Sequence, residues 1–304
     1  MLRELFLALS HSERARAFAS GSAAVRPAVR RFIAGETMDD GLAAAAALRA
    51  RGIDATLDLL GEATASEDDA RRCARGYVEV LNSVFHRGVH AHVSLKLSQM
   101  GLDLSEDLAA DLLGMIARTA AAVGTFVRVD MEDSGRLPAT LRVFDRVWQS
   151  GVRNVGIVLQ AYLYRTPDDV ARYTRQGVSI RLCKGAYAEP ASLAYPRKAD
   201  VDEAYARLAE QLLLYGHQPA LATHDQRLIA HSRAFAAARG IGKERFEFQF
   251  LYGIRRDLQE RLVQEGYRVR VYVPFGTHWY PYFMRRLAER PANVAFIARH
   301  LIGA

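Results

Sequence analysis

The chain has 304 residues, half of them hydrophobic, which is enough for one large barrel domain or two ordinary domains. Its net charge of +7 comes mostly from arginines that are spread along the chain and alternate with acidic residues, so no basic stripe indicates nucleic-acid binding. The only cysteines, Cys73 and Cys183, give no disulfide framework, and neither a membrane span nor a signal peptide is evident. Together these features predict a cytoplasmic protein.

The first fifty residues are helical in pattern. Apolar residues recur at helical spacing over 2–19, 24–34 and 38–51, and Gly52 ends the third helix. We therefore expect residues 1–50 to form an N-terminal helical segment, with residues 51–304 forming the catalytic domain.

From residue 53 onward, short apolar strands alternate with longer helical patterns. The predicted strands are 53–60, 92–97, 126–131, 155–161, 179–183, 220–223, 246–251 and 269–273. The predicted helices between them are 67–87, 106–123, 137–150, 167–176, 201–215, 226–239 and 256–265. This rhythm predicts a (βα)₈ barrel, which usually spans about 250 residues. An open dinucleotide-binding sheet is disfavoured, because the first strand is followed by a single glycine, Gly61.

The stretch 272–291 begins at the end of the eighth strand, breaks at Pro274 and Gly276, and continues as an eighth helix. Aromatic residues accompany the adjacent Arg285 and Arg286, a combination that suits a small anion with an apolar body. Adjacent residues do not share a helix face, so an ordinary amphipathic surface helix is the alternative.

Polar residues collect where the strands end, which is where barrel enzymes carry their chemistry. Buried charges need a partner, so these residues should either form internal ion pairs, such as Lys96 with Asp130, or meet a ligand. The set comprises Lys96, Asp130, Glu132, Gln160, Arg181, Lys184, Tyr187, Thr223, His224, Asp225 and Gln249.

Two other kinds of site are disfavoured. His86 and His90 precede the second strand and His92 begins it, at the end of the barrel opposite the expected site, and no group of carboxylates joins them. Neither cysteine has an evident histidine partner, and no Gly-x-Ser-x-Gly motif is present. We therefore expect no metal site and no nucleophilic triad.

Several motifs together resemble the proline dehydrogenase family, and they occur in that family's order. They are Arg181-Leu-Cys-Lys-Gly-Ala-Tyr187, Ala222-Thr-His-Asp225, Phe246-Glu-Phe-Gln-Phe-Leu251 and Tyr272-x-Pro-x-Gly followed by Arg285-Arg286-x-x-Glu289. The resemblance covers about residues 50 to 295 and is to the monofunctional bacterial enzymes. It implies a distorted (βα)₈ barrel with the eighth helix over its mouth, and FAD-dependent oxidation of L-proline to Δ1-pyrroline-5-carboxylate by hydride transfer to flavin N5.

The resemblance also implies roles for individual residues. Asp130 and Arg181 are the expected catalytic residues. The expected substrate-binding residues are Lys96, Tyr187, Leu251, Tyr272, Tyr282, Arg285 and Arg286. The expected FAD-binding residues are Asp130, Met131, Gln160, Arg181, Lys184, Gly185, Ala186, Arg197, Lys198, Thr223, His224, Gln249 and Glu289. Pro196 and Asp225 depart from residues common in relatives, which puts individual cofactor contacts in question.

The partners follow from the same resemblance. It implies a quinone as electron acceptor, hence peripheral membrane contact, and a downstream pyrroline-5-carboxylate dehydrogenase. Two alternatives remain open at this point. One is a barrel lyase that forms a Schiff base through Lys96 or Lys184, with Asp130 as general acid or base. The other is a catalytically silent barrel that binds an anion or a membrane surface through its arginines.

Overall fold

The structure, a computed structural model, describes residues 26–289, so the predicted helix at residues 2–19 lies outside it. Eight parallel strands form a closed barrel in which each strand pairs with the next and β8 pairs with β1. The strands are β1 (Asp54–Leu59), β2 (Ala91–Leu95), β3 (Val127–Val129), β4 (Val155–Gln160), β5 (Ile180–Cys183), β6 (Ala220–Ala222), β7 (Glu247–Leu251) and β8 (Arg268–Phe275). The predicted barrel is confirmed, and each strand end lies within two residues of its predicted position.

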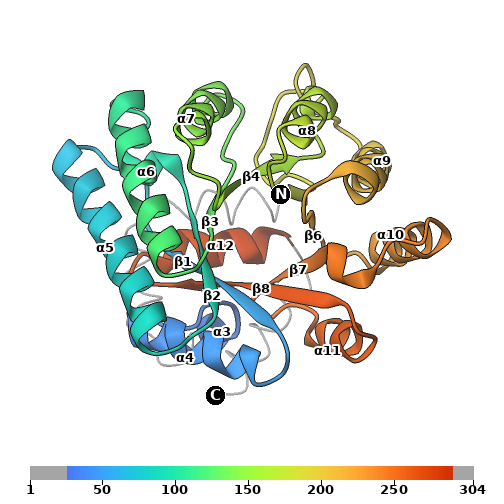
Figure 1. The fold of residues 1–304 in the computed structure, drawn as a ribbon, viewed down its shortest axis with the longest axis horizontal. Helices are drawn as coiled ribbons and strands as arrows, with labels where there is room; N and C mark the ends of the chain where they lie inside the picture. Colours follow the sequence, from blue (N-terminus) through green and yellow to red (C-terminus); the bar gives the residue numbers. More distant parts are fainter. Residues whose placement is uncertain (1–25, 290–304) are drawn as a thin grey trace.

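Helices connect successive strands and surround the barrel (Figure 1). They are α5 (Glu67–His86), α6 (Glu106–Ala122), α7 (Leu137–Gln149), α8 (Thr166–Arg175), α9 (Lys198–Tyr215), α10 (Gln226–Ala238) and α11 (Arg256–Gln264), with short 3₁₀ turns η1 (Leu97–Met100) and η2 (Lys243–Arg245). Local sequence fixes several starts: the Ser66 and Ser105 hydroxyls cap α5 and α6 by accepting backbone N–H bonds.

Helix α4 (Met38–Arg49) completes the wall of the barrel. It begins with a capping box in which Thr37 and Asp40 each accept a hydrogen bond from the other's backbone N–H. Its apolar face, with Leu42, Ala45 and Leu48 buried, packs on β1 and β8. In a regular barrel the helix after β8 fills this place. Here a helix that precedes β1 fills it instead.

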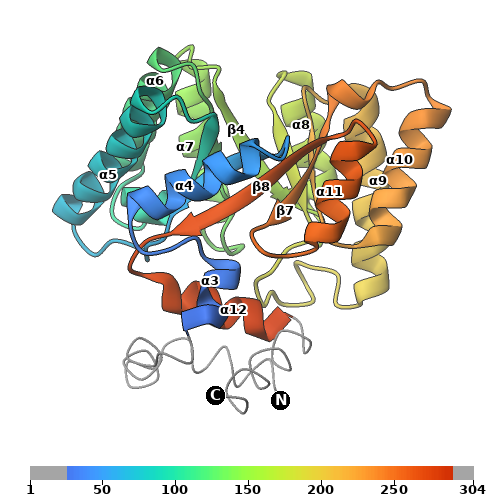
Figure 2. The same cartoon turned by 90° about the horizontal axis from the view of Figure 1, so that it is seen from below.

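The helix after β8, α12 (Trp279–Glu289), lies across one end of the barrel together with α3 (Arg26–Phe32) (Figure 2). The two helices share a hydrophobic cluster separate from the main core, in which the rings of Phe32 and Phe283 lie 6.3 Å apart. The Trp279 indole N–H also donates to Glu36 at 2.9 Å. The eighth helix therefore lies over the barrel mouth, as expected.

A buried charged layer fills the amino-terminal end of the barrel. Glu247 accepts two hydrogen bonds from Arg270 Nε, at 3.0 and 3.1 Å, and Arg128 donates to the Ser179 carbonyl at 2.6 Å. Burial raises the pKa of Glu247, but Arg270 outweighs it and the pKa falls to about 2. This layer is an internal ion-pair network at the end of the barrel opposite α12, so we assign it to stability.

Candidate active site

A cavity of about 670 Å³ lies at the carboxyl ends of the strands, next to α12. Its size suits a small-molecule or cofactor site. It gathers the predicted site residues Lys96, Asp130, Met131, Gln160, Arg181, Lys184, Gly185, Ala186, Tyr187, Lys198, Thr223, His224, Gln249, Leu251, Tyr272, Tyr282, Arg285 and Arg286. Two predicted residues are not among them: Arg197 is outside the cavity, and the Glu289 side chain lies outside the described part of the structure.

Asp130 is the centre of a hydrogen-bond network. One of its oxygens accepts from Arg181 at 2.9 Å and from the Ser94 hydroxyl at 2.7 Å, and the other accepts from the Tyr272 hydroxyl at 2.8 Å. The Arg181 guanidinium also lies 5.5 Å from the centre of the Tyr272 ring. Strands β5 and β8 and the residue after β3 thus hold these three side chains in one fixed arrangement.

Lys96 pairs with a residue that the sequence prediction missed. Its ammonium lies 3.6 Å from Asp58 Oδ1, whereas the ion-pair partner of Asp130 is Arg181, so the suggested Lys96–Asp130 pair is wrong. Burial alone would lower the pKa of Lys96, but the carboxylates of Asp58 and Asp130 outweigh it and raise this pKa above its usual value. Lys96 therefore presents a positive charge to the cavity at neutral pH.

Arg285 and Arg286 both line the cavity, although they are neighbours on α12. Arg286 is buried and lies 4.9 Å from the centre of the Tyr282 ring, one turn earlier, and Arg285 is partly buried. Adjacent residues of a helix point in different directions, which made a shared site for these two arginines doubtful from the sequence. Both can line the cavity because α12 crosses the mouth and presents more than one face to it. Three cations, Lys96 and these two arginines, thus meet at one site.

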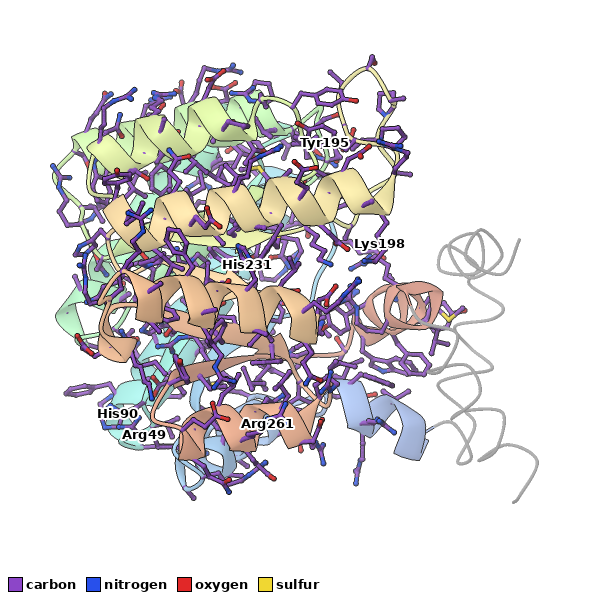
Figure 3. The ribbon with its side chains drawn as sticks, turned by 90° about the vertical axis from the view of Figure 1, so that its right-hand side faces the viewer. Arg49, His90, Tyr195, Lys198, His231 and Arg261 are labelled. Carbon is purple, nitrogen blue, oxygen red and sulfur yellow. The ribbon has the colours of Figure 1, made fainter. Side chains whose placement is uncertain are left out.

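A second group of charges lies toward the start of α9. Lys184 donates to Asp202 at 2.5 Å and to Asp225 at 3.1 Å, and Lys198 also pairs with Asp202. Helix α9 starts at Lys198, three residues earlier than predicted, and Figure 3 shows Lys198 at the α12 end of the molecule. Arg197, just outside the helix, does not line the cavity; its side chain is 78% exposed and pairs with Asp200.

The cavity wall has features that fit a planar heterocyclic cofactor. Gln160 Oε1 and Arg181 Nε are buried and have no hydrogen-bond partner among the described residues, so an acceptor and a donor are available to a ligand. Gly185, with φ +113°, brings the backbone to the cavity where a Cβ would lie 2.3 Å from the Tyr162 ring. These features match the flavin that the family resemblance implies.

Strands β6 and β7 contribute the remaining wall. His224 Nε2 accepts a hydrogen bond from the Leu251 backbone N–H at 3.0 Å, which fixes the ring, and Gln249 donates to Glu247 in the layer below. The structure adds lining residues that the sequence did not indicate: Val158, Cys183, Ala222, Gln226, Phe250 and Arg255. Most are apolar or belong to connecting segments, where no sequence signal separates a lining residue from an ordinary one.

The histidine cluster takes no part in this site. Figure 3 shows His90 at the end of the molecule away from α12, and His92 packs against Phe126 with ring centres 5.2 Å apart. Burial, followed by the nearby Arg270, lowers the pKa of His92 well below its usual value. Within residues 26–289, no group of three or more potential ligands could hold a metal ion.

A (βα)₈ barrel with a charged cavity at the carboxyl ends of its strands, roofed by a helix, defines an enzyme of the barrel class. Comparison with known sequences narrows this class: the family described as "Proline dehydrogenase" matches residues 41–299. The chain belongs to the proline dehydrogenase family.

Individual relatives agree with this assignment. The proline dehydrogenase of Deinococcus radiodurans is 45% identical over 276 residues, covering 90% of this chain and 89% of that protein. Proline dehydrogenase 1 of Bacillus subtilis (strain 168) is 40% identical over 302 residues, which is 99% of each chain. The crystal structure of proline utilization A (PutA) from Bdellovibrio bacteriovorus, inactivated by N-propargylglycine, matches with a TM-score of 0.82 and 29% identity over 91% of this chain. This chain spans 34% of that longer protein.

Proposed function

We propose that this protein oxidises L-proline to Δ1-pyrroline-5-carboxylate with FAD bound in the cavity. The observation that carries the proposal is the meeting of three cations, Lys96, Arg285 and Arg286, with aromatic rings and unsatisfied polar atoms in one cavity at the barrel mouth. The relatives named proline dehydrogenase support the choice of substrate.

The substrate end is built for an anionic ring. Arg285, Arg286 and Lys96 would bind the proline carboxylate through charge-assisted hydrogen bonds, which are stronger than neutral ones. The rings of Tyr187, Tyr272 and Tyr282 would enclose the pyrrolidine and, with Leu251, keep water away from it. Since the amine must be neutral when hydride leaves the ring, the positive charge around the cavity helps by disfavouring a further cation.

FAD, when bound, would supply the hydride acceptor, and a quinone would take up the electrons from the reduced cofactor. Gln160 Oε1 and Arg181 Nε would bind the edge of its ring system, and the 184–186 backbone with Lys184 and Lys198 would bind its tail. Asp130 holds Arg181 in place through the 2.9 Å ion pair, so the guanidinium is positioned to stabilise negative charge that develops on the cofactor.

The Schiff-base alternative is the weaker one. A nucleophilic lysine has to be neutral, but the Asp58 and Asp130 carboxylates raise the pKa of Lys96. Lys184 is in turn paired with both Asp202 and Asp225. Lys96 is therefore held in its charged form, and Lys184 is already engaged in two ion pairs.

An anaerobic titration of the purified protein with L-proline tests the proposal. The oxidised flavin absorbance should bleach as L-proline is added. As a control, tetrahydrofuran-2-carboxylate, which has oxygen in place of the ring nitrogen, should perturb the flavin spectrum without bleaching it. Protein that carries no flavin, or flavin that stays oxidised at saturating L-proline, would contradict the proposal, and borohydride trapping of a carbonyl substrate on Lys96 or Lys184 would favour the lyase.

The quinone acceptor and a peripheral position at the membrane extend this proposal from the family resemblance. None of the helices within residues 26–289 is long and apolar enough to span a bilayer. Turnover of L-proline with a soluble ubiquinone analogue, together with sedimentation of the protein with anionic lipid vesicles, tests both. Electron transfer to oxygen alone would contradict the first, and absence from the vesicle pellet the second.

A further inference from the structure

Asp58 is a buried carboxylate that the proposed chemistry does not yet use. It lies near the carboxyl end of β1 and is fully buried, with 0% exposure. Neither of its oxygens meets hydrogen-bond geometry with any donor of the described residues. A carboxylate in such a place is costly unless a cation compensates it, and the ammonium of Lys96, 3.6 Å away, is the one cation within ion-pair distance in the described part of the chain.

The carboxylates of Asp58, which is buried, and Asp130, which is partly buried, have different partners. Asp130 is fully engaged by Arg181, Ser94 and Tyr272, and it lines the cavity. Asp58 does not line the cavity and reaches it only through Lys96, whose side chain is 19% exposed. Asp130 thus holds Arg181, while Asp58 contacts Lys96, the residue that would bind the substrate carboxylate.

We propose that Asp58 is a positioning residue: it keeps Lys96 protonated and holds its ammonium at the cavity wall to bind the substrate carboxylate. This inference rests on the proposed function only for the identity of the substrate. Without Asp58, the buried amine of Lys96 would lose its closest counter-ion and could lose its proton within the ordinary assay range.

Other ionisable groups face the pair and set the size of the effect. Lys96 is also influenced by Asp130, Tyr187 and Glu132, all of which favour its charged form. Burial raises the pKa of Asp58 above its usual value, and Asp130 adds to this rise. Lys96, the Tyr272 hydroxyl and Arg285 of α12 act against it and favour the charged carboxylate. Burial raises the pKa of Cys73 and of Tyr77 on α5, and the nearby charge of Asp58 raises each further. Among the charged groups around Lys96, Asp58 has the largest effect on its pKa, so removal of Asp58 should lower that pKa the most.

The test measures how the affinity for tetrahydrofuran-2-carboxylate depends on pH, by the change in the flavin spectrum of the FAD-loaded protein. In the wild type the dissociation constant should be nearly flat between about pH 7 and pH 10, because Lys96 stays charged. In Asp58→Asn it should rise with pH, up to about tenfold per unit once Lys96 deprotonates. Asp54→Asn, the same change at the other end of β1, should keep the flat profile.

A flat profile in Asp58→Asn would overturn the proposal, since it would mean that Asp58 is neutral or that other groups hold the Lys96 proton. The double variant Asp58→Asn/Lys96→Met should bind no more weakly than Lys96→Met alone. Bleaching of the wild type by L-proline is a separate measurement, so failure of the proposed function and failure of this inference are distinguishable.

Thermal unfolding gives a second test that does not need Asp58→Asn to fold by itself. Lys96→Met leaves the Asp58 carboxylate buried without its counter-ion and should lower Tm, because an unpaired buried charge is strongly destabilising. Adding Asp58→Asn to Lys96→Met removes that charge and should recover most of the lost Tm. A double variant that is no more stable than Lys96→Met would also overturn the proposal.

Discussion

Gly185→Ala tests whether the backbone beside Lys184 has to approach the cofactor without a side chain. Gly185 has φ +113°, and an added Cβ would lie 2.3 Å from Tyr162 Cδ1. The Tyr162 ring cannot easily retreat, because it is buried and its backbone N–H donates to the Lys184 carbonyl at 2.9 Å. Relief of the clash therefore displaces the 184–186 segment itself.

The expected cost has two parts. A side chain in the left-handed region costs about 1–2 kcal/mol, and forcing extra volume against a packed ring costs about 1–3 kcal/mol more. Gly177→Ala is a matched control, because Gly177 also has positive φ, +71°, but no atom lies within 4 Å of its added Cβ. The control should show only the first part, about 1–2 kcal/mol.

Two measurements check this expectation. Denaturant unfolding of the flavin-free variants should show Gly185→Ala to be less stable than Gly177→Ala, and FAD titration should show weaker binding for Gly185→Ala alone. If Gly185→Ala matches Gly177→Ala in stability and binds FAD like the wild type, the reasoning about this backbone approach is refuted.

Three further substitutions test the proposed substrate-carboxylate site, the proposed flavin contact of Arg181 and the buried charged layer. Arg285→Met should raise KM for proline about 10- to 100-fold, the loss of one charge-assisted contact, while FAD stays bound; an unchanged KM contradicts this. Arg181→Met should make the flavin potential more negative and slow turnover, and wild-type values of both would contradict its role. Glu247 has its pKa lowered to about 2, so its stabilising effect is full above about pH 4.5 and is lost as pH falls toward 2. Glu247→Gln should therefore destabilise by about 3 kcal/mol at neutral pH in denaturant unfolding, with a difference that shrinks in acid; a constant difference contradicts the assignment.

The sequence predicted the barrel well because its signals are local. Each strand is a short apolar run and each helix has its own period, and some helices also begin at a capping residue, such as Ser66 and Ser105. Motif order then indicated which strand ends face the cavity. The place of α4 was not predictable in this way, because its amphipathic period identifies a helix but not the strands on which it packs.

The sequence predicted which residues line the cavity better than it predicted which of them form ion pairs with each other. Lys96 stood out in an apolar strand, but its partner Asp58 lies 38 positions earlier and looks like any acidic residue near a strand end. Lys198 lines the cavity and Arg197 does not. Which of the two does so depends on the residue at which α9 begins. Such choices depend on three-dimensional register, which residue spacing alone does not determine.

The exchange of roles between α4 and α12 has a consequence for biosynthesis. The helix that seals the wall between β8 and β1 is made before any strand, and the helix over the mouth is the last described element to leave the ribosome. The barrel can therefore close as soon as β8 emerges, while its mouth is still uncovered. The FAD that we propose for the cavity would be able to enter at that stage, before Trp279 and Phe283 of α12 join the α3 cluster.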